Sequence, residues 1–115
     1  MRKFAYLREP LPRDEGAPVV KIMLYEAEEG HYLFEYTSPD AVFCSADLCY
    51  DSLAELYDEW NGRIDDRGWT DLDDPLPDCQ HDAFLPIRAK GRDAGKPEWG
   101  KFEILKDGEW IDYDL

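Results

Sequence analysis

Two stretches in which side chains alternate between two faces, each interrupted by a tight turn, commit much of this chain to antiparallel strands. Residues 19–27 and 31–37 flank the turn sequence EEG, in which glycine can adopt a positive φ. Residues 101–113 alternate on both sides of Asp107-Gly108, the dipeptide that two-residue hairpin turns favour. We therefore expect one hairpin in the first third of the chain and another at its C-terminal end.

Weaker patterns add further strands to this framework. Residues 3–7, 41–46 and 83–89 are each predicted as a strand, and Pro86 restricts the last of these to an edge or a bulge. The proline-rich segment 9–18 is predicted as a turn. These strands and the two hairpins predict a mainly antiparallel sheet of about five to six strands.

One segment has the signals of an amphipathic helix. Ser52 and Glu55 have the spacing of a capping box, and Gly62 is a suitable stop. The apolar residues that follow the spacing of one helical face are Leu53, Leu56, Tyr57, Trp60 and Ile64. We therefore predict an α+β fold, in which this helix packs on one face of the meander-and-hairpin sheet.

The chain length of 115 residues suits one domain, so residues 1–115 are expected to form a single globular domain. The apolar fraction of 43% argues against disorder in spite of the charge. Three irregularly spaced cysteines, Cys44, Cys49 and Cys79, do not suit a secreted disulfide scaffold. No apolar leader follows the two basic residues near the N-terminus, and we expect a cytoplasmic protein.

Negative charge is concentrated in the middle of the chain. Residues 26–82 contain two Lys/Arg and seventeen Asp/Glu, a net charge of −15, and the whole chain has a net charge of −14. On the predicted helix, Glu55 and Glu59 are four residues apart and repel each other by a few tenths of a kcal/mol. Such a field disfavours nucleic acid and anionic membranes and attracts cationic partners. Solubility alone is the alternative explanation.

The sequence DLDDPLPDCQHDAF, residues 71–84, raises the question of a metal site. Cys79 and His81 are the candidate zinc ligands, but the Cys-x-His spacing is not that of a zinc knuckle. The prolines also prevent a calcium loop of the EF-hand type. We expect a rigid acidic connection with neither metal nor cofactor. A metal- or small-ligand-binding domain that uses Cys79, His81 and an aromatic groove is the alternative function.

Signals for catalysis are weak, and we assign no catalytic residue. His31 and His81 are the two histidines, and no hydrolase or metalloprotease motif accompanies them. The run GRDAGKP lacks the spacing of a phosphate-binding loop. Six aromatic residues could line a ligand groove, but core packing is the favoured interpretation. They are Tyr32, Phe34, Tyr36, Trp60, Trp69 and Trp110.

These observations favour a small, acidic, non-enzymatic protein that binds a basic protein partner. In charge, size and hairpin-rich composition the chain resembles small bacterial immunity and inhibitor proteins, which share composition rather than a motif, so no residue role carries over. A further hypothesis is self-association through Met23 and Tyr25 on an exposed sheet face. The predicted partner-binding residues are Glu55, Asp58, Glu59, Asp65, Asp66, Asp71, Asp73 and Asp74.

Overall fold

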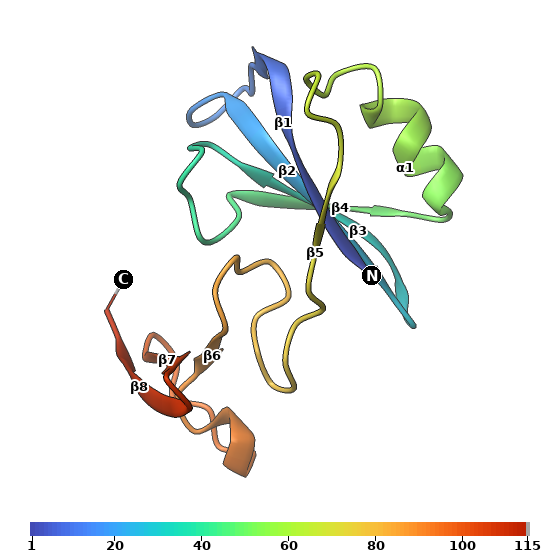
Figure 1. The fold of residues 1–115 in the computed structure, drawn as a ribbon. Coiled ribbons are helices and arrows are strands. Elements are labelled where there is room, and N and C mark those ends of the chain that lie inside the picture. Colours follow the sequence, from blue (N-terminus) through green and yellow to red (C-terminus); the bar gives the residue numbers. More distant parts are fainter. Residues whose placement is uncertain (115) are drawn as a thin grey trace. The chain divides into compact units, whose positions relative to one another are not determined.

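Eight strands, all paired antiparallel, form two separate sheets in residues 1–114, the part of the chain that this computed structural model describes (Figure 1). The chain divides into two units, Met1–Asp74 and Pro75–Leu115, and each contains one of the sheets. The predicted α+β class with mainly antiparallel strands is therefore confirmed. The predicted single sheet of five to six strands is wrong, and folding of residues 1–115 as one domain stays a prediction.

The first unit is built on a five-stranded sheet with the strand order β4-β3-β2-β1-β5. Its central hairpin has the predicted bounds almost unchanged, since Val19–Ala27 pairs with Gly30–Tyr36 through the expected turn. The strands of this sheet are β1 (Arg2–Leu11), β2 (Val19–Ala27), β3 (Gly30–Tyr36), β4 (Ala46–Tyr50) and β5 (Thr70–Leu72).

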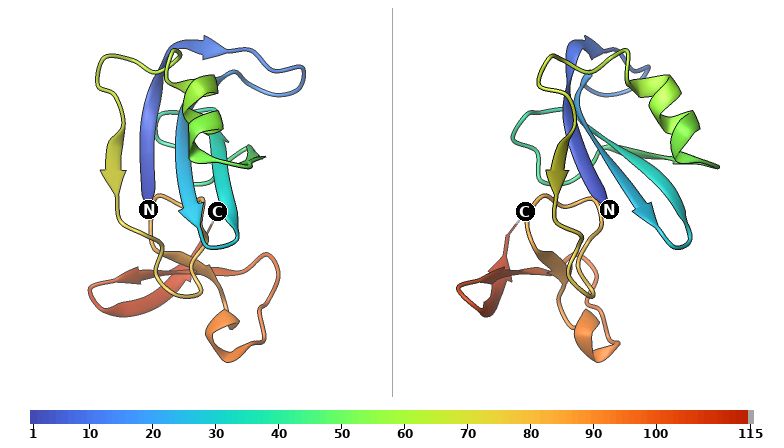
Figure 2. Two further views of the ribbon diagram at one scale, coloured as in Figure 1. Left: turned by 90° about the vertical axis from the view of Figure 1, so that its right-hand side faces the viewer. Right: turned by 45° about the vertical axis from the view of Figure 1, so that its right-hand side comes forward.

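Helix α1 (Leu53–Trp60) lies over one face of this sheet (Figure 2). Ser52 is its N-cap, and the Ser52 hydroxyl accepts a hydrogen bond from the Glu55 amide, as the capping signal predicted. Leu56 and Trp60 are buried from the helix side. They join the sheet residues Ala5, Val19, Ile22, Leu24 and Leu33 in one apolar core.

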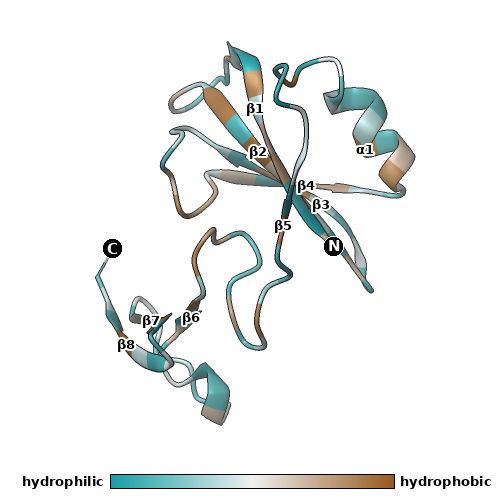
Figure 3. Ribbon diagram, in the orientation of Figure 1, coloured by the Kyte–Doolittle hydropathy of each residue, from teal (hydrophilic) through white to brown (hydrophobic). Residues whose placement is uncertain are grey.

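Both faces of the central strands are buried. Ile22 and Leu24 belong to the core beneath α1, and Met23, on the opposite face of β2, is completely buried as well. Figure 3 shows the resulting apolar bands along β1 and β2. Since Met23 is not exposed, it cannot serve the self-association that we considered from the sequence.

Two predicted boundaries in the first unit are wrong. Strand β1 continues through Pro10 to Leu11, and a register shift between Tyr6 and Leu11 accommodates the proline, which cannot donate a ladder hydrogen bond. The strand predicted over 41–46 instead begins at Ala46. Segment 37–45 is irregular, and two of its carbonyls, those of Pro39 and Ala41, accept hydrogen bonds from Lys21 of β2.

The second unit contains the three-stranded sheet β6-β7-β8 and a short 3-10 helix, η1. Asp107 and Gly108 both have positive φ values, 52° and 81°, so the C-terminal hairpin has the turn geometry that its sequence predicted. The strand predicted over 83–89 is reduced to three residues after Pro86. The elements of this unit are β6 (Ile87–Ala89), η1 (Arg92–Ala94), β7 (Phe102–Lys106) and β8 (Glu109–Tyr113).

The acidic sequence of residues 71–84 connects β5 to β6, and the boundary between the two units lies within it. Apart from Thr70–Leu72 it has no regular secondary structure before β6, and Asp78 has a left-handed backbone conformation with φ of 68°. Among the described residues, no helix combines the length and the apolar character of a membrane span.

Candidate interaction surface

All eight acidic residues that the sequence singled out belong to the first unit, where they fall into three groups. Glu55, Asp58 and Glu59 lie on the solvent side of α1 and are exposed, because the opposite side of the helix is buried in the core. No lysine or arginine of the described chain forms an ion pair with these three carboxylates. We call these three residues the helix acids.

Glu59 has a neutral partner rather than a cation. The Tyr50 hydroxyl donates a hydrogen bond to the Glu59 carboxylate and accepts one from Trp60 Nε1 at 2.9 Å. Burial of the phenol and its bond to the Glu59 carboxylate together raise the pKa of Tyr50 to about 12. These two hydrogen bonds, from Trp60 to Tyr50 and from Tyr50 to Glu59, hold the Glu59 carboxylate beside β4. Neither of them brings a positive charge to it.

The second group, Asp65 and Asp66, occupies the turn after α1. Arg67 Nη2 lies 2.6 Å from Asp65 Oδ2, and this hydrogen-bonded guanidinium lowers the pKa of the Asp65 carboxyl. Arg67 also stacks over the ring of Tyr6, at 3.9 Å from the ring centre. Asp65 is thus compensated, whereas Asp66 is exposed and forms no ion pair within the described residues.

The third group follows β5, and two of its three carboxylates have cationic neighbours. Asp71 lies 3.5 Å from Lys3 Nζ, and Asp74 lies 2.9 Å from the N-terminal ammonium group of Met1. Asp73 is exposed and has no ion pair among the described residues. The β5 group is therefore more nearly neutral than the helix acids.

The helix acids and the β5 group do not form one patch. Glu59 is bonded to β4, and β4 and β5 are the two opposite edges of the five-stranded sheet. Four strand spacings separate those edges, which corresponds to about 19 Å. The Debye length at physiological ionic strength is about 8 Å, so exposed charges at this separation are largely screened from each other. The helix acids are the strongest candidate surface.

Two arginines near the C-terminal end of α1, Arg63 and Arg8, bind backbone carbonyls rather than the helix acids. Arg63 Nε donates to the Glu59 carbonyl at 3.3 Å, and the Arg63 guanidinium lies over the ring of Trp60. Arg8 donates to the carbonyls of Gly62 and Ile64 at 3.4 and 3.2 Å. The Glu59 carbonyl belongs to the last turn of α1, where the helix leaves carbonyl groups without partners, and Gly62 and Ile64 follow the helix. The two arginines place positive charge at the C-terminal end of α1 and leave the helix acids unpaired.

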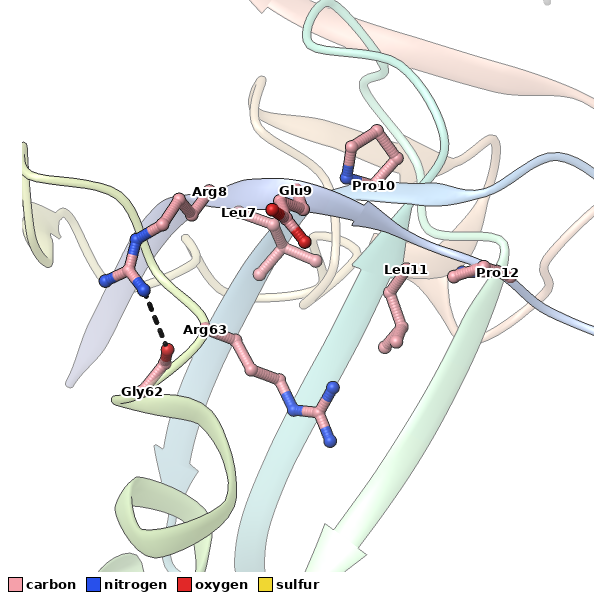
Figure 4. Close-up of a pocket in the computed structure, with 8 residues that line it drawn as sticks. All are labelled: Leu7, Arg8, Glu9, Pro10, Leu11, Pro12, Gly62 and Arg63. Carbon is pink, nitrogen blue, oxygen red and sulfur yellow. Dashed lines mark hydrogen bonds between the residues drawn. The ribbon is translucent and has the colours of Figure 1, made fainter.

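A hollow of about 320 Å³ lies where β1 meets this end of the helix (Figure 4). Its walls include Leu7, Leu11 and two prolines, and Figure 4 shows Arg8 turned toward Gly62 and Arg63 extending along the opposite side. Both arginines of this hollow already bind backbone carbonyls, and Glu9 is the other charged residue of its lining. We assign it no ligand.

The alternative site around Cys79 and His81 gains no further ligand from the structure. Cys79 is buried, with 3% of its surface exposed, and His81 is exposed. Within the described residues, no group of three or more His, Cys, Asp or Glu side chains is arranged to hold a metal ion. Cys44 is half-buried and Cys49 is exposed on β4, in the first unit.

The aromatic residues considered for a ligand groove are divided among different environments. Trp60 is in the core beneath α1, whereas Tyr32 and Phe34 stack on the opposite face of the sheet with ring centres 6.3 Å apart. Trp110 belongs to the second unit, where Arg88 lies over its ring at 3.7 Å. Trp69 packs edge-on against Tyr57. These residues do not line one groove.

The sequence analysis missed a charged pair close to the helix acids. Glu35 of β3 is buried, with 3% of its side chain exposed, and accepts hydrogen bonds from two nitrogens of the Arg13 guanidinium. Its hydrogen bond to Glu35 raises the pKa of Arg13. The available signal was a glutamate within an apolar strand, between Phe34 and Tyr36.

No protein-family model, curated protein sequence or solved structure matches this chain. The candidate surface therefore stands on the geometry of this molecule.

Proposed function

We propose that this protein is a small, acidic, non-enzymatic interaction protein that binds a basic protein partner through the helix acids. Asp66 and Asp73 add further negative charge. The observation that carries the proposal is the absence of any ion pair to Glu55, Asp58 or Glu59 among the described residues, although Arg63 lies one turn away. A cationic surface can therefore bind these carboxylates without first breaking an ion pair of this protein.

Complementary charge acts mainly on the rate of association and on the choice of partner. The net charge of −14 disfavours nucleic acid and anionic lipid and favours a partner of opposite sign. An immunity- or inhibitor-like role is part of this proposal. A cytoplasmic location is part of it too, and the exposed thiol of Cys49 suits a reducing compartment.

The test compares proteins captured from native lysate by the wild type and by two variants of equal net charge. The triple variant E55Q/D58N/E59Q removes the helix acids. The control variant D14N/E28Q/E29Q removes three exposed acids outside α1. We expect basic proteins to bind the wild type and the control at low salt and to be released at high salt. Their loss from the triple variant alone would support the proposal.

Two results would contradict this function. Capture of the same proteins by all three forms would show that the helix acids are not the binding surface. Failure of every form to retain a basic protein at low salt would remove the case for a cationic partner.

A further inference from the structure

A hollow of about 620 Å³ opens beside β4 and is lined by five parts of the first unit. They are the β1–β2 loop, β3, the β3–β4 loop, β4 and α1. Because β4 is an edge of its sheet, no further strand of the described chain pairs with its outer side. The residues that define its character are Arg13, Glu15, Glu35, Ala46, Leu48 and Glu59.

The charges in this hollow do not balance. Three glutamates line it, and Arg13 is the single cation of the lining. Arg13 is committed to Glu35, which is buried and accepts bonds from two of its nitrogens. Glu59 has the neutral Tyr50 hydroxyl as its partner, and Glu15 is exposed and forms no ion pair in the described chain. Glu59 attracts Arg13 as well, but one guanidinium among three carboxylates leaves the lining with a net charge of −2, which favours a second cation.

The walls also suit the shape of a long basic side chain. Ala17, Ala46 and Leu48 provide apolar surface beside the carboxylates. Lysine and arginine pack their aliphatic stems along such surface and place the charged group at a polar end. Arg13 demonstrates that a guanidinium fits here, since its planar group already meets Glu35 edge-on with two hydrogen bonds.

We propose that this hollow is the socket for an arginine side chain of the basic partner, with Glu59 as the carboxylate that receives it and Leu48 as the wall along its stem. This inference rests on the proposed function and makes it specific. Of the three helix acids, Glu59 is the one that lines the hollow, so it contributes more to binding than Glu55 or Asp58. Glu55 and Asp58 contribute only to the negative electrostatic potential around α1.

The probe for this socket is a synthetic peptide, blocked at both ends, that alternates arginine with serine. Its control has citrulline in place of each arginine, which keeps the shape of the side chain and removes the charge. Binding to the full-length ¹⁵N-labelled protein is followed by NMR at low and at physiological ionic strength. We expect the arginine peptide to shift the amide signals of Ala46, Leu48 and Glu59 in particular.

The variants E59Q and E55Q form a matched pair, because each removes one charge from the same helix. We expect E59Q to weaken binding of the arginine peptide about five- to tenfold and E55Q to weaken it less than about twofold. The glutamine oxygen of E59Q can still accept the Tyr50 hydrogen bond, and thermal melting checks that the fold is kept. A46L, which fills the hollow without changing any charge, should weaken binding as much as E59Q.

Each outcome decides between the two proposals. Equal losses in E59Q and E55Q, with shifts spread along α1, would overturn the socket and leave the proposed function standing. Equal binding of the arginine and citrulline peptides would overturn both. If L-arginine amide alone bound as tightly as the peptide, the hollow would be a small-cation site, and its assignment to a protein partner would be wrong.

Discussion

The two units of this protein use their basic side chains in different ways. The first unit has seven Lys/Arg and eighteen Asp/Glu, a net charge of −11, whereas residues 75–115 have six and nine, a net charge of −3. Four of the seven cations in the first unit donate to backbone carbonyls: Arg2, Arg8, Lys21 and Arg63.

In the second unit two of the six cations, Arg88 and Lys90, bind carboxylates, as three of the first unit's seven also do. Arg88 Nε lies 2.7 Å from Glu103 and Arg88 Nη2 lies 3.5 Å from Asp93, while Lys90 Nζ lies 2.9 Å from Asp112. Hydrogen bonding to Asp112 raises the pKa of Lys90. A basic side chain that donates to a backbone carbonyl gives that carbonyl a hydrogen bond, but it leaves nearby carboxylates without an ion pair. Among the described residues, four of the 18 carboxylates in the first unit pair with Lys, Arg or the N-terminal ammonium group, against three of the nine in the second unit.

The largest expected effect tests whether the acidic surface depends on the core beneath α1. W60A removes the indole that packs against the sheet and donates to Tyr50, and should lower the free energy of unfolding by about 3–5 kcal/mol. The control W99A removes a tryptophan that is 88% exposed and should change stability very little. Urea denaturation measures both. Equal losses would show that Trp60 does not anchor the helix.

The second prediction concerns the neutralised carboxylates of the second unit. R88M leaves Glu103 without its cation, and the two side chains are only 12% and 13% exposed, so we expect a loss of about 2–3 kcal/mol. Adding E103Q to R88M should recover part of this loss, because no unpaired charge then remains. A double-mutant cycle in urea measures the coupling. Strictly additive effects would contradict the contrast between the units.

The third prediction tests the cations that bind carbonyls. Lys21 is buried and its Nζ donates to the carbonyls of Pro39 and Ala41, both at 2.9 Å. K21M should cost about 1–3 kcal/mol and speed amide exchange in segment 37–45, since two carbonyls lose a charged donor. The exposed Lys106 provides the control K106M. Unchanged exchange in K21M would show that Lys21 does not hold this segment.

The smallest expected effect is on the titration of Tyr50. Its pKa of about 12 in the folded protein exceeds the ordinary value of 10.0, so the neutral phenol is favoured by folding. The stability that this provides is complete below pH 10 and is lost as the pH rises through about 12. Ultraviolet absorbance of phenolate measures the titration, with Y50F identifying the signal. In E59Q the midpoint should fall, and an unchanged midpoint would show that Glu59 does not act on Tyr50.

Local sequence signals determined much of the fold. The turn at Asp107-Gly108, the hairpin of β2 and β3 and the cap at Ser52 depend on residues that are close in the sequence, so short-range patterns predicted them. The negative charge of the first unit could also be predicted from the sequence, because it depends on the number of acidic and basic residues and not on how they are folded. The solvent side of α1 follows from its apolar spacing.

Only the tertiary structure decided which charges remain unpaired. Lys21 donates to the carbonyls of Pro39 and Ala41, 18 and 20 residues away, and residues 41–45 do not form the strand predicted over 41–46. Arg13 lies between β1 and β2 and Glu35 lies in β3, 22 residues away, so their contact depends on how these strands pair. The partner of a long basic side chain depends on contacts that are distant in sequence. The net charge could therefore be predicted from the sequence, but the hollow beside Glu59 could not.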